Sequence, residues 1–105
     1  MRPLHFVIFG KNSEILKTLK RIIENTSNWN ATIQEEISSC KNYLKDNRVD
    51  IILLSSGLSL KEERDIVEHL SLLDYPIALI QHYGGGSGLL KNEVYSLFPE
   101  LIPDK

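Results

Sequence analysis

The chain has 105 residues, of which 25% are charged and 42% hydrophobic, and its formal net charge is -2. This size and composition are typical of one globular domain, so we expect residues 1–105 to form a single domain. Acidic and basic residues are interspersed, which argues against nucleic acid as a main partner. No run approaches the ~18 apolar residues of a membrane span, so we expect no membrane partner.

The cysteine count and the N-terminal sequence limit the chemistry further. Cys40 is the only cysteine, which excludes an intramolecular disulfide and argues against a cysteine-based metal site. The apolar run Phe6–Phe9 is too short for a signal peptide, so we expect a cytoplasmic protein. We expect no metal and no cofactor.

Continuous apolar runs predict strands that are buried on both faces, because helices cover both sides of a parallel sheet. The clearest cases are Leu4–Phe9, which is apolar except for His5, and Val49–Leu54, in which the run Ile51–Leu54 is unbroken. Trp29–Glu35 alternates with period two, which is typical of an edge strand. Pro76–Ile80 is the expected fourth strand, with Gln81, His82 and Tyr83 continuing to its carboxyl end.

Apolar residues at helical spacing predict a helix after each strand. The expected helices cover residues 13–24, 36–47 and 59–74, and a last helix is marked by Leu89, Leu90, Val94, Leu97 and Phe98. Ser13 and Ser59 are the expected N-caps, and Glu62 follows Ser59 at capping-box spacing. In the third helix we expect the core-facing residues to be Leu60, Ile66, Val67, Leu70 and Leu73, and we expect His69 to be solvated.

Strand and helix alternate four times, and right-handed crossovers then give a doubly wound parallel sheet. We predict a flavodoxin-like three-layer α/β fold with strand order 2-1-3-4, in which a fifth strand–helix unit is missing or reduced. Ligands of such sheets bind at the carboxyl ends of the strands. The candidate cleft therefore lies between residues 10–12, 55–57 and 81–86.

The order and lengths of the expected elements resemble the receiver domains of bacterial two-component response regulators over nearly the whole chain, and three stretches carry the resemblance. RVDIILLSSGLS is similar to the family's R-x-D-hydrophobic-L-L-D-x-x-M-P stretch, and PIALIQHYG is similar to its P-I-I-h-L-T-A-Y-G, where h is any apolar residue. EEISSCKNYLKDNRVD is in step with its second-helix segment. The resemblance implies the same Rossmann-like sheet and a role in signal transduction.

The departures from the family pattern fall on its chemistry. The phospho-acceptor aspartate corresponds to Ser55, and the acidic pair that holds Mg²⁺ falls within Phe9–Lys11, where no residue is acidic. The switch Ser/Thr corresponds to Gln81, and the lysine after strand five has no match except Lys105. Aspartyl phosphorylation needs a carboxylate nucleophile and a divalent cation. We therefore expect a pseudo-receiver: a non-phosphorylated interaction module, not an enzyme.

The glycine-rich segment after the fourth strand has three possible interpretations. Gly84, Gly85, Gly86, Ser87 and Gly88 precede a helix, and such a loop can present several backbone N–H groups to one anion. It fits neither a P-loop nor a dinucleotide-binding fingerprint. It is a connector, a phosphate or nucleotide site, or a protein-docking loop. The candidate binding residues are Gly10, Lys11, Ser55, Ser56, Gln81, His82 and the five loop residues Gly84–Gly88.

A small-ligand-binding domain is the alternative function. Ser56-Gly57-Leu58 and Gly84-Gly85 fit part of the cobalamin-binding pattern, but its histidine-bearing loop after the first strand is absent. Ser55-Ser56-Gly57-Leu58 also resembles the phosphorylated site of anti-sigma factor antagonists, a fold that starts with strands. His82 and Ser55 face the same cleft, yet no Asp or Glu is placed to orient them, which argues against a hydrolase.

The edge beside the fourth strand is expected to lack full cover, because the fifth unit is missing or reduced. An uncovered apolar edge is a liability in a folded domain. We therefore expect a homodimer or a protein partner to cover the last helix and the fourth-strand edge.

Overall fold

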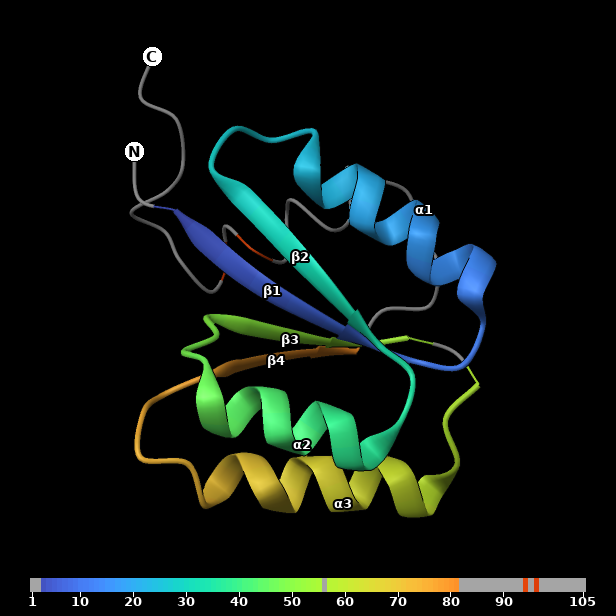
Figure 1. The fold of residues 1–105 in the computed structure, drawn as a ribbon, viewed down its shortest axis with the longest axis vertical. Coiled ribbons are helices and arrows are strands. Elements are labelled where there is room, and N and C mark those ends of the chain that lie inside the picture. The colour runs from blue at the N-terminus through green and yellow to red at the C-terminus, as the bar shows by residue number, and fades with distance from the viewer. Residues whose placement is uncertain (1–2, 56, 82–93, 95, 97–105) are drawn as a thin grey trace.

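A computed structural model describes residues 3–55, 57–81, 94 and 96 of the chain. It shows an α/β fold with a four-stranded, all-parallel sheet of order β2-β1-β3-β4 (Figure 1). The predicted fold class and strand order are therefore confirmed, and the arrangement is consistent with a flavodoxin-like fold. The expected fifth unit and most of the expected last helix lie outside the described residues.

The described elements follow one another as predicted, with ends that differ by a few residues. In chain order they are β1 (Leu4–Phe9), α1 (Ser13–Glu24), β2 (Trp29–Gln34), α2 (Ile37–Asp46), β3 (Ile51–Leu54), α3 (Leu60–Ser71) and β4 (Ala78–Gln81). β4 begins two residues later than expected, because Pro76 has no N–H to donate. The Ala78 N–H donates to Asp50 O at 3.0 Å, where β4 joins the sheet.

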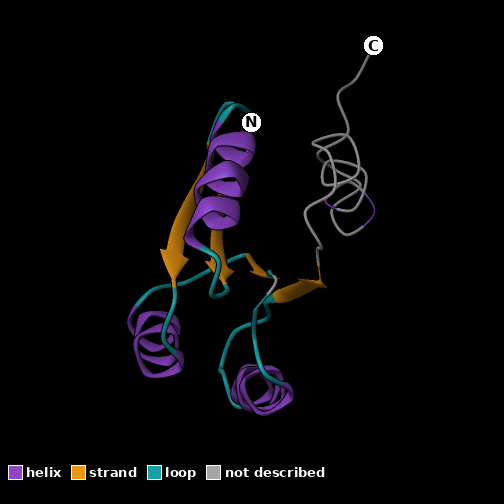
Figure 2. Cartoon of the chain, turned by 90° about the vertical axis from the view of Figure 1, so that its right-hand side faces the viewer, coloured by secondary structure: helices purple, strands orange, loops and turns teal. Residues whose placement is uncertain are grey.

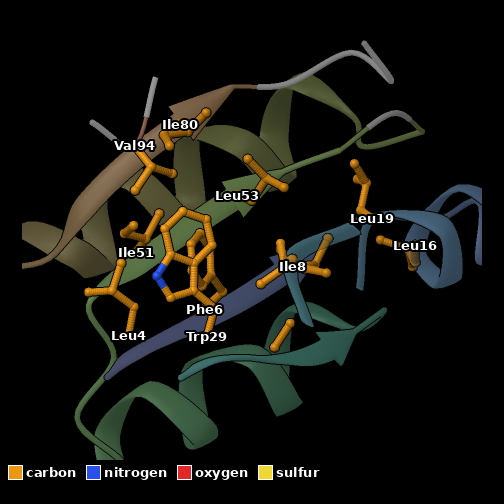
Figure 3. Packing of buried hydrophobic residues seen from close by; sticks show 12 residues of the cluster. Leu4, Phe6, Ile8, Leu16, Leu19, Trp29, Ile51, Leu53, Ile80 and Val94 are labelled. Atoms are coloured by element: carbon orange, nitrogen blue, oxygen red, sulfur yellow. The ribbon is translucent and has the colours of Figure 1, made fainter. Parts of the chain in front are cut away.

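Helices cover both faces of the sheet, as the apolar runs predicted (Figure 2). On one face Phe6, Ile8, Ile51 and Leu53 pack with Leu16, Leu19 and Ile23 of α1, and Trp29, Ile80 and Val94 join this cluster (Figure 3). On the other face Val7, Phe9, Ile52 and Leu54 pack against α2 and α3. Cys40 belongs to this second cluster, as expected, and burial raises the pKa of its thiol to about 12.

The helix N-caps were predicted correctly in one case and wrongly in the other. Ser59 caps α3, and it forms the expected capping box with Glu62. Asn12, not Ser13, caps α1: its side chain accepts a hydrogen bond from Ile15 N–H at 3.1 Å. Asn12 has the extended backbone that an N-cap requires, whereas Ser13 is already helical.

The outward side of α3 differs from the prediction. Ile66, Leu70 and Leu73 face the core as expected, but Leu60 is 74% exposed and Val67 is 42% exposed. The reason is that α3 covers the margin of the sheet, where only one side of the helix meets other described elements. His69 was expected in solvent, but it is partly buried, and its buried Nε2 has no hydrogen-bond partner in the part of the chain that the structure describes.

Candidate functional site

The carboxyl edge of the sheet brings together residues from three strands. The register places Phe9 beside Leu54, and Leu54 beside Gln81. Beyond these pairs the Ser55 N–H donates to Phe9 O at 2.9 Å, and the Gly10 N–H donates to Gln34 O at 3.2 Å. Gly10, Ser55 and Gln81 therefore lie along one edge, which is the place the sequence predicted for the cleft.

Lys11 connects the loops at this edge. Its Nζ lies 3.2 Å from Glu62 Oε2 and 3.8 Å from Glu36 Oε2, and it donates a hydrogen bond to Glu35 O. Glu36 precedes α2, and Glu62 lies in the first turn of α3. One ammonium group thus ties the segment after β1 to the segments before α2 and α3.

Glu62 is held from two sides. Its carboxylate accepts a hydrogen bond from the Ser59 N–H at 3.0 Å, and this backbone bond, together with Lys11, holds its pKa below the ordinary value. The Lys11 and Glu62 side chains are 33% and 23% exposed, so water screens the ion pair and its net contribution to stability is small. Its effect is to fix where the two charges lie.

Gly57 allows Lys11 to approach the segment after β3. Its φ of 94° lies in the left-handed region, which disfavours residues with a Cβ. A Cβ placed there would lie 2.8 Å from Lys11 Cβ. Glycine is therefore required at this position both by the backbone conformation and by the closeness of Lys11.

Ser55 is buried at the same edge and has an unused hydroxyl. The residue is 5% exposed, and among the described residues its Oγ has no hydrogen-bond partner. A buried hydroxyl without a partner costs free energy, so its presence calls for a reason. No described histidine or carboxylate hydrogen-bonds to this Oγ, so the structure shows no base that would make it a nucleophile.

The described residues do not form a cation site at this edge. Among residues 3–55, 57–81, 94 and 96, no group of three or more His, Cys, Asp or Glu side chains could hold a metal ion. The two carboxylates nearest the cleft, Glu36 and Glu62, already face the Lys11 ammonium. The remaining predicted binding residues, Ser56, His82 and Gly84–Gly88, lie outside the described residues.

An open groove lies beside the carboxyl edge, between α3 and β4. Its volume is about 420 Å³, and its lining residues are Leu60, Glu63, Arg64, Val67, Glu68 and Gln81. Sequence reasoning placed Gln81 in the cleft, but it missed this groove because Leu60 and Val67 were assigned to the core. It also missed Glu36 and Glu62 as partners of Lys11, since the capping-box spacing shows where Glu62 lies but not what it faces.

α1 carries three basic residues close together, Lys17, Lys20 and Arg21, and Lys20 has a structural role. Lys20 Nζ lies 2.8 Å from Glu24 Oε2 and donates to Ala31 O at 2.6 Å, while Glu24 accepts the Ala31 N–H at 3.1 Å. The hydrogen bond from Lys20 lowers the pKa of the Glu24 carboxyl. These bonds link α1 to β2, so Lys20 and Glu24 stabilise the fold.

Comparisons with protein-family models, curated proteins and solved structures found no match to this chain. Within the described part of the chain, no helix is long and apolar enough to cross a membrane.

Replacing Lys11 with Met should raise the pKa of the Glu62 carboxyl, because the ammonium no longer favours its ionised form. The pKa should stay below 4.5, since the Ser59 N–H, the larger cause, remains. A carboxyl group whose pKa is lower in the folded state than in the unfolded state stabilises the fold above its unfolded-state pKa. This stabilisation is lost as the pH falls through the folded-state pKa. The variant should thus lose less than ~1 kcal/mol of unfolding free energy at neutral pH. The part of the loss that comes from the ion pairs should vanish in acid, whereas the part from the hydrogen bond to Glu35 O should remain.

Carboxyl carbon NMR titration of Glu62 measures the pKa, and urea unfolding at several pH values measures stability. Lys17→Met, on the exposed side of α1, is the matched control and should leave Glu62 unchanged. An unshifted Glu62 pKa in the Lys11 variant would contradict the assigned contact.

Proposed function

We propose that this chain is a receiver-like domain that acts as a signalling and protein-interaction module without phosphotransfer. The observation that carries the proposal is the arrangement of Lys11, Glu36 and Glu62 at the carboxyl edge of the sheet. A cation occupies the region where receiver chemistry requires an acidic pair. The parallel sheet of order 2-1-3-4 supports the comparison with receivers.

The charges at this edge oppose phosphorylation. A divalent cation needs several oxygen ligands, usually carboxylates, and an adjacent ammonium group repels it. Ser55 stands at the acceptor position, and a serine hydroxyl needs a base to become an effective nucleophile. Neither requirement is met by the described residues around Ser55.

An interaction role is supported by the margin of the sheet at β4. Leu60, Val67 and Leu79 are exposed large apolar residues on α3 and β4. β4 pairs with β3 on one side, and within the described residues no strand pairs with its other side. An apolar surface next to a free strand edge is typical of a protein interface. A homodimer or another protein covering this edge fits these features.

Incubation with acetyl phosphate and Mg²⁺ should leave the intact mass of the protein unchanged. The reason is that the described residues do not provide an activated nucleophile together with ligands for Mg²⁺. Intact-mass spectrometry measures the outcome. A receiver that retains the acceptor aspartate, treated in parallel, shows that the reagent is active. A phospho-adduct on this chain would overturn the proposal.

Binding of a small anion is the second candidate, and the unused Ser55 hydroxyl favours it. A thermal-shift panel of phosphate, nucleotides, cyclic dinucleotides and cobalamin tests it. A ligand at a hundred times its Kd adds about 2.7 kcal/mol, which raises Tm by several degrees or more for a domain of this size. A shift that Ser55→Ala abolishes would favour the ligand function, and a flat panel would exclude these ligands.

A further inference from the structure

We infer that a second copy of this chain covers the groove between α3 and β4, so that the protein forms a two-fold dimer. The inference deepens the proposed interaction role and rests on it. The dimer would join the β4 strands antiparallel at the sheet edge and pack the two α3 helices against each other. The dimer is supported by the residues that line the groove, by their exposure and by their charges.

The groove is lined by one continuous stripe on α3. Leu60, Glu63, Arg64, Val67 and Glu68 follow the three- and four-residue spacing that places side chains on one side of a helix. The stripe combines apolar residues with both signs of charge. Within the described part of the chain, the side chains of Glu63, Arg64 and Glu68 have no ion-pair partner. The surface therefore offers unpaired charges next to exposed apolar area.

The charges of Arg64 and Glu68 can pair with the same two residues of a second copy related by a two-fold axis. A symmetric dimer requires such a self-complementary surface. Arg64 and Glu68 are four residues apart, so their midpoint is the level of Ile66. If two α3 helices pack antiparallel about an axis at that level, Arg64 of each copy lies opposite Glu68 of the other. Val67, one residue from the axis, would contact Val67 of the second copy.

The exposed apolar side chains of the groove would be buried in the same arrangement. Leu60 is 74% exposed and Val67 is 42% exposed, and both line the groove. Burial of such side chains is a main source of association free energy.

The sheet edge and the helix face fit one geometry. Hydrogen-bonded strands lie about 4.8 Å apart. α3 connects β3 to β4, which are neighbours in the sheet, so we place it over this pair of strands. Joining two β4 strands would then separate the α3 helices by about twice the strand spacing, close to the 8–10 Å of packed helices. Figure 2 shows β4 at the margin of the sheet, on the side where this partner would add.

Charge reversal with rescue tests the dimer. Sedimentation equilibrium should show a dimer for the wild type at tens of micromolar. Arg64→Glu and Glu68→Arg should each weaken the dimer by about tenfold or more, because each change places like charges opposite one another twice. The double variant Arg64→Glu/Glu68→Arg should recover most of the lost affinity, since it restores opposite charges at both contacts.

Lys17→Glu on the exposed side of α1 is the control for an unrelated charge reversal, and it should leave the dimer intact. Urea unfolding should confirm that all variants are folded, since Arg64 and Glu68 are exposed. A wild-type protein that stays monomeric at hundreds of micromolar overturns the dimer. This holds also if residues 82–105 prove to be what covers the groove. So does a dimer that neither single reversal weakens, or one that the double variant fails to restore.

The phosphotransfer experiment separates the two proposals. It does not depend on the oligomeric state, so a monomer that takes up no phosphate would overturn the dimer alone. A phospho-adduct would overturn the proposed function even if the charge-reversal series supports the dimer.

Discussion

The constraint on which this structure depends is the burial of β1 and β3 on both faces. Every side chain of β3 is buried, and so are five of the six in β1. Strands of this kind are stable only when apolar layers cover both sides of the sheet, which α1 supplies on one face and α2 with α3 on the other. Short crossovers between such strands then bring all carboxyl ends to one edge. The position of the candidate site is a consequence of this burial.

At the carboxyl edge of the sheet, the described residues form a structural contact. Lys11 spans the loops of three strand–helix units through Glu35, Glu36 and Glu62, and Gly57 leaves room for it. The same contacts that hold the loops in place neutralise the carboxylates nearest the edge. If the proposed function holds, this arrangement would combine the sheet of a receiver with charges that oppose metal binding. The groove beside α3 then offers an interaction surface, because among the described residues it combines exposed apolar side chains with charges that have no ion-pair partner.

Much of the fold could be predicted from local patterns, whereas the site required knowledge of contacts between distant residues. The runs Leu4–Phe9 and Ile51–Leu54 define buried strands by themselves, and Ser59 with Glu62 defines the start of α3. Helical spacing alone could not show that Leu60 and Val67 lie outside the core, because spacing gives the side of a helix but not the extent of the sheet it covers. The same limit applies to Lys11, because Glu35 and Glu62 lie 24 and 51 residues further along the chain. No local pattern in the sequence shows that they are close to Lys11.

The central claim is that the carboxyl edge is occupied by the Lys11 contacts and does not bind the divalent cation of receiver chemistry. Titration of the ¹⁵N-labelled protein with Mg²⁺, followed through the amide signals of Gly10, Lys11, Ser55 and Gly57, tests it most directly. A second titration with NaCl at matched ionic strength provides the reference. If the Lys11 contacts exclude a divalent cation, the two titrations should give the same small, non-saturating shifts. Saturable shifts at these amides with Mg²⁺ alone would show a metal site at the edge and overturn this claim.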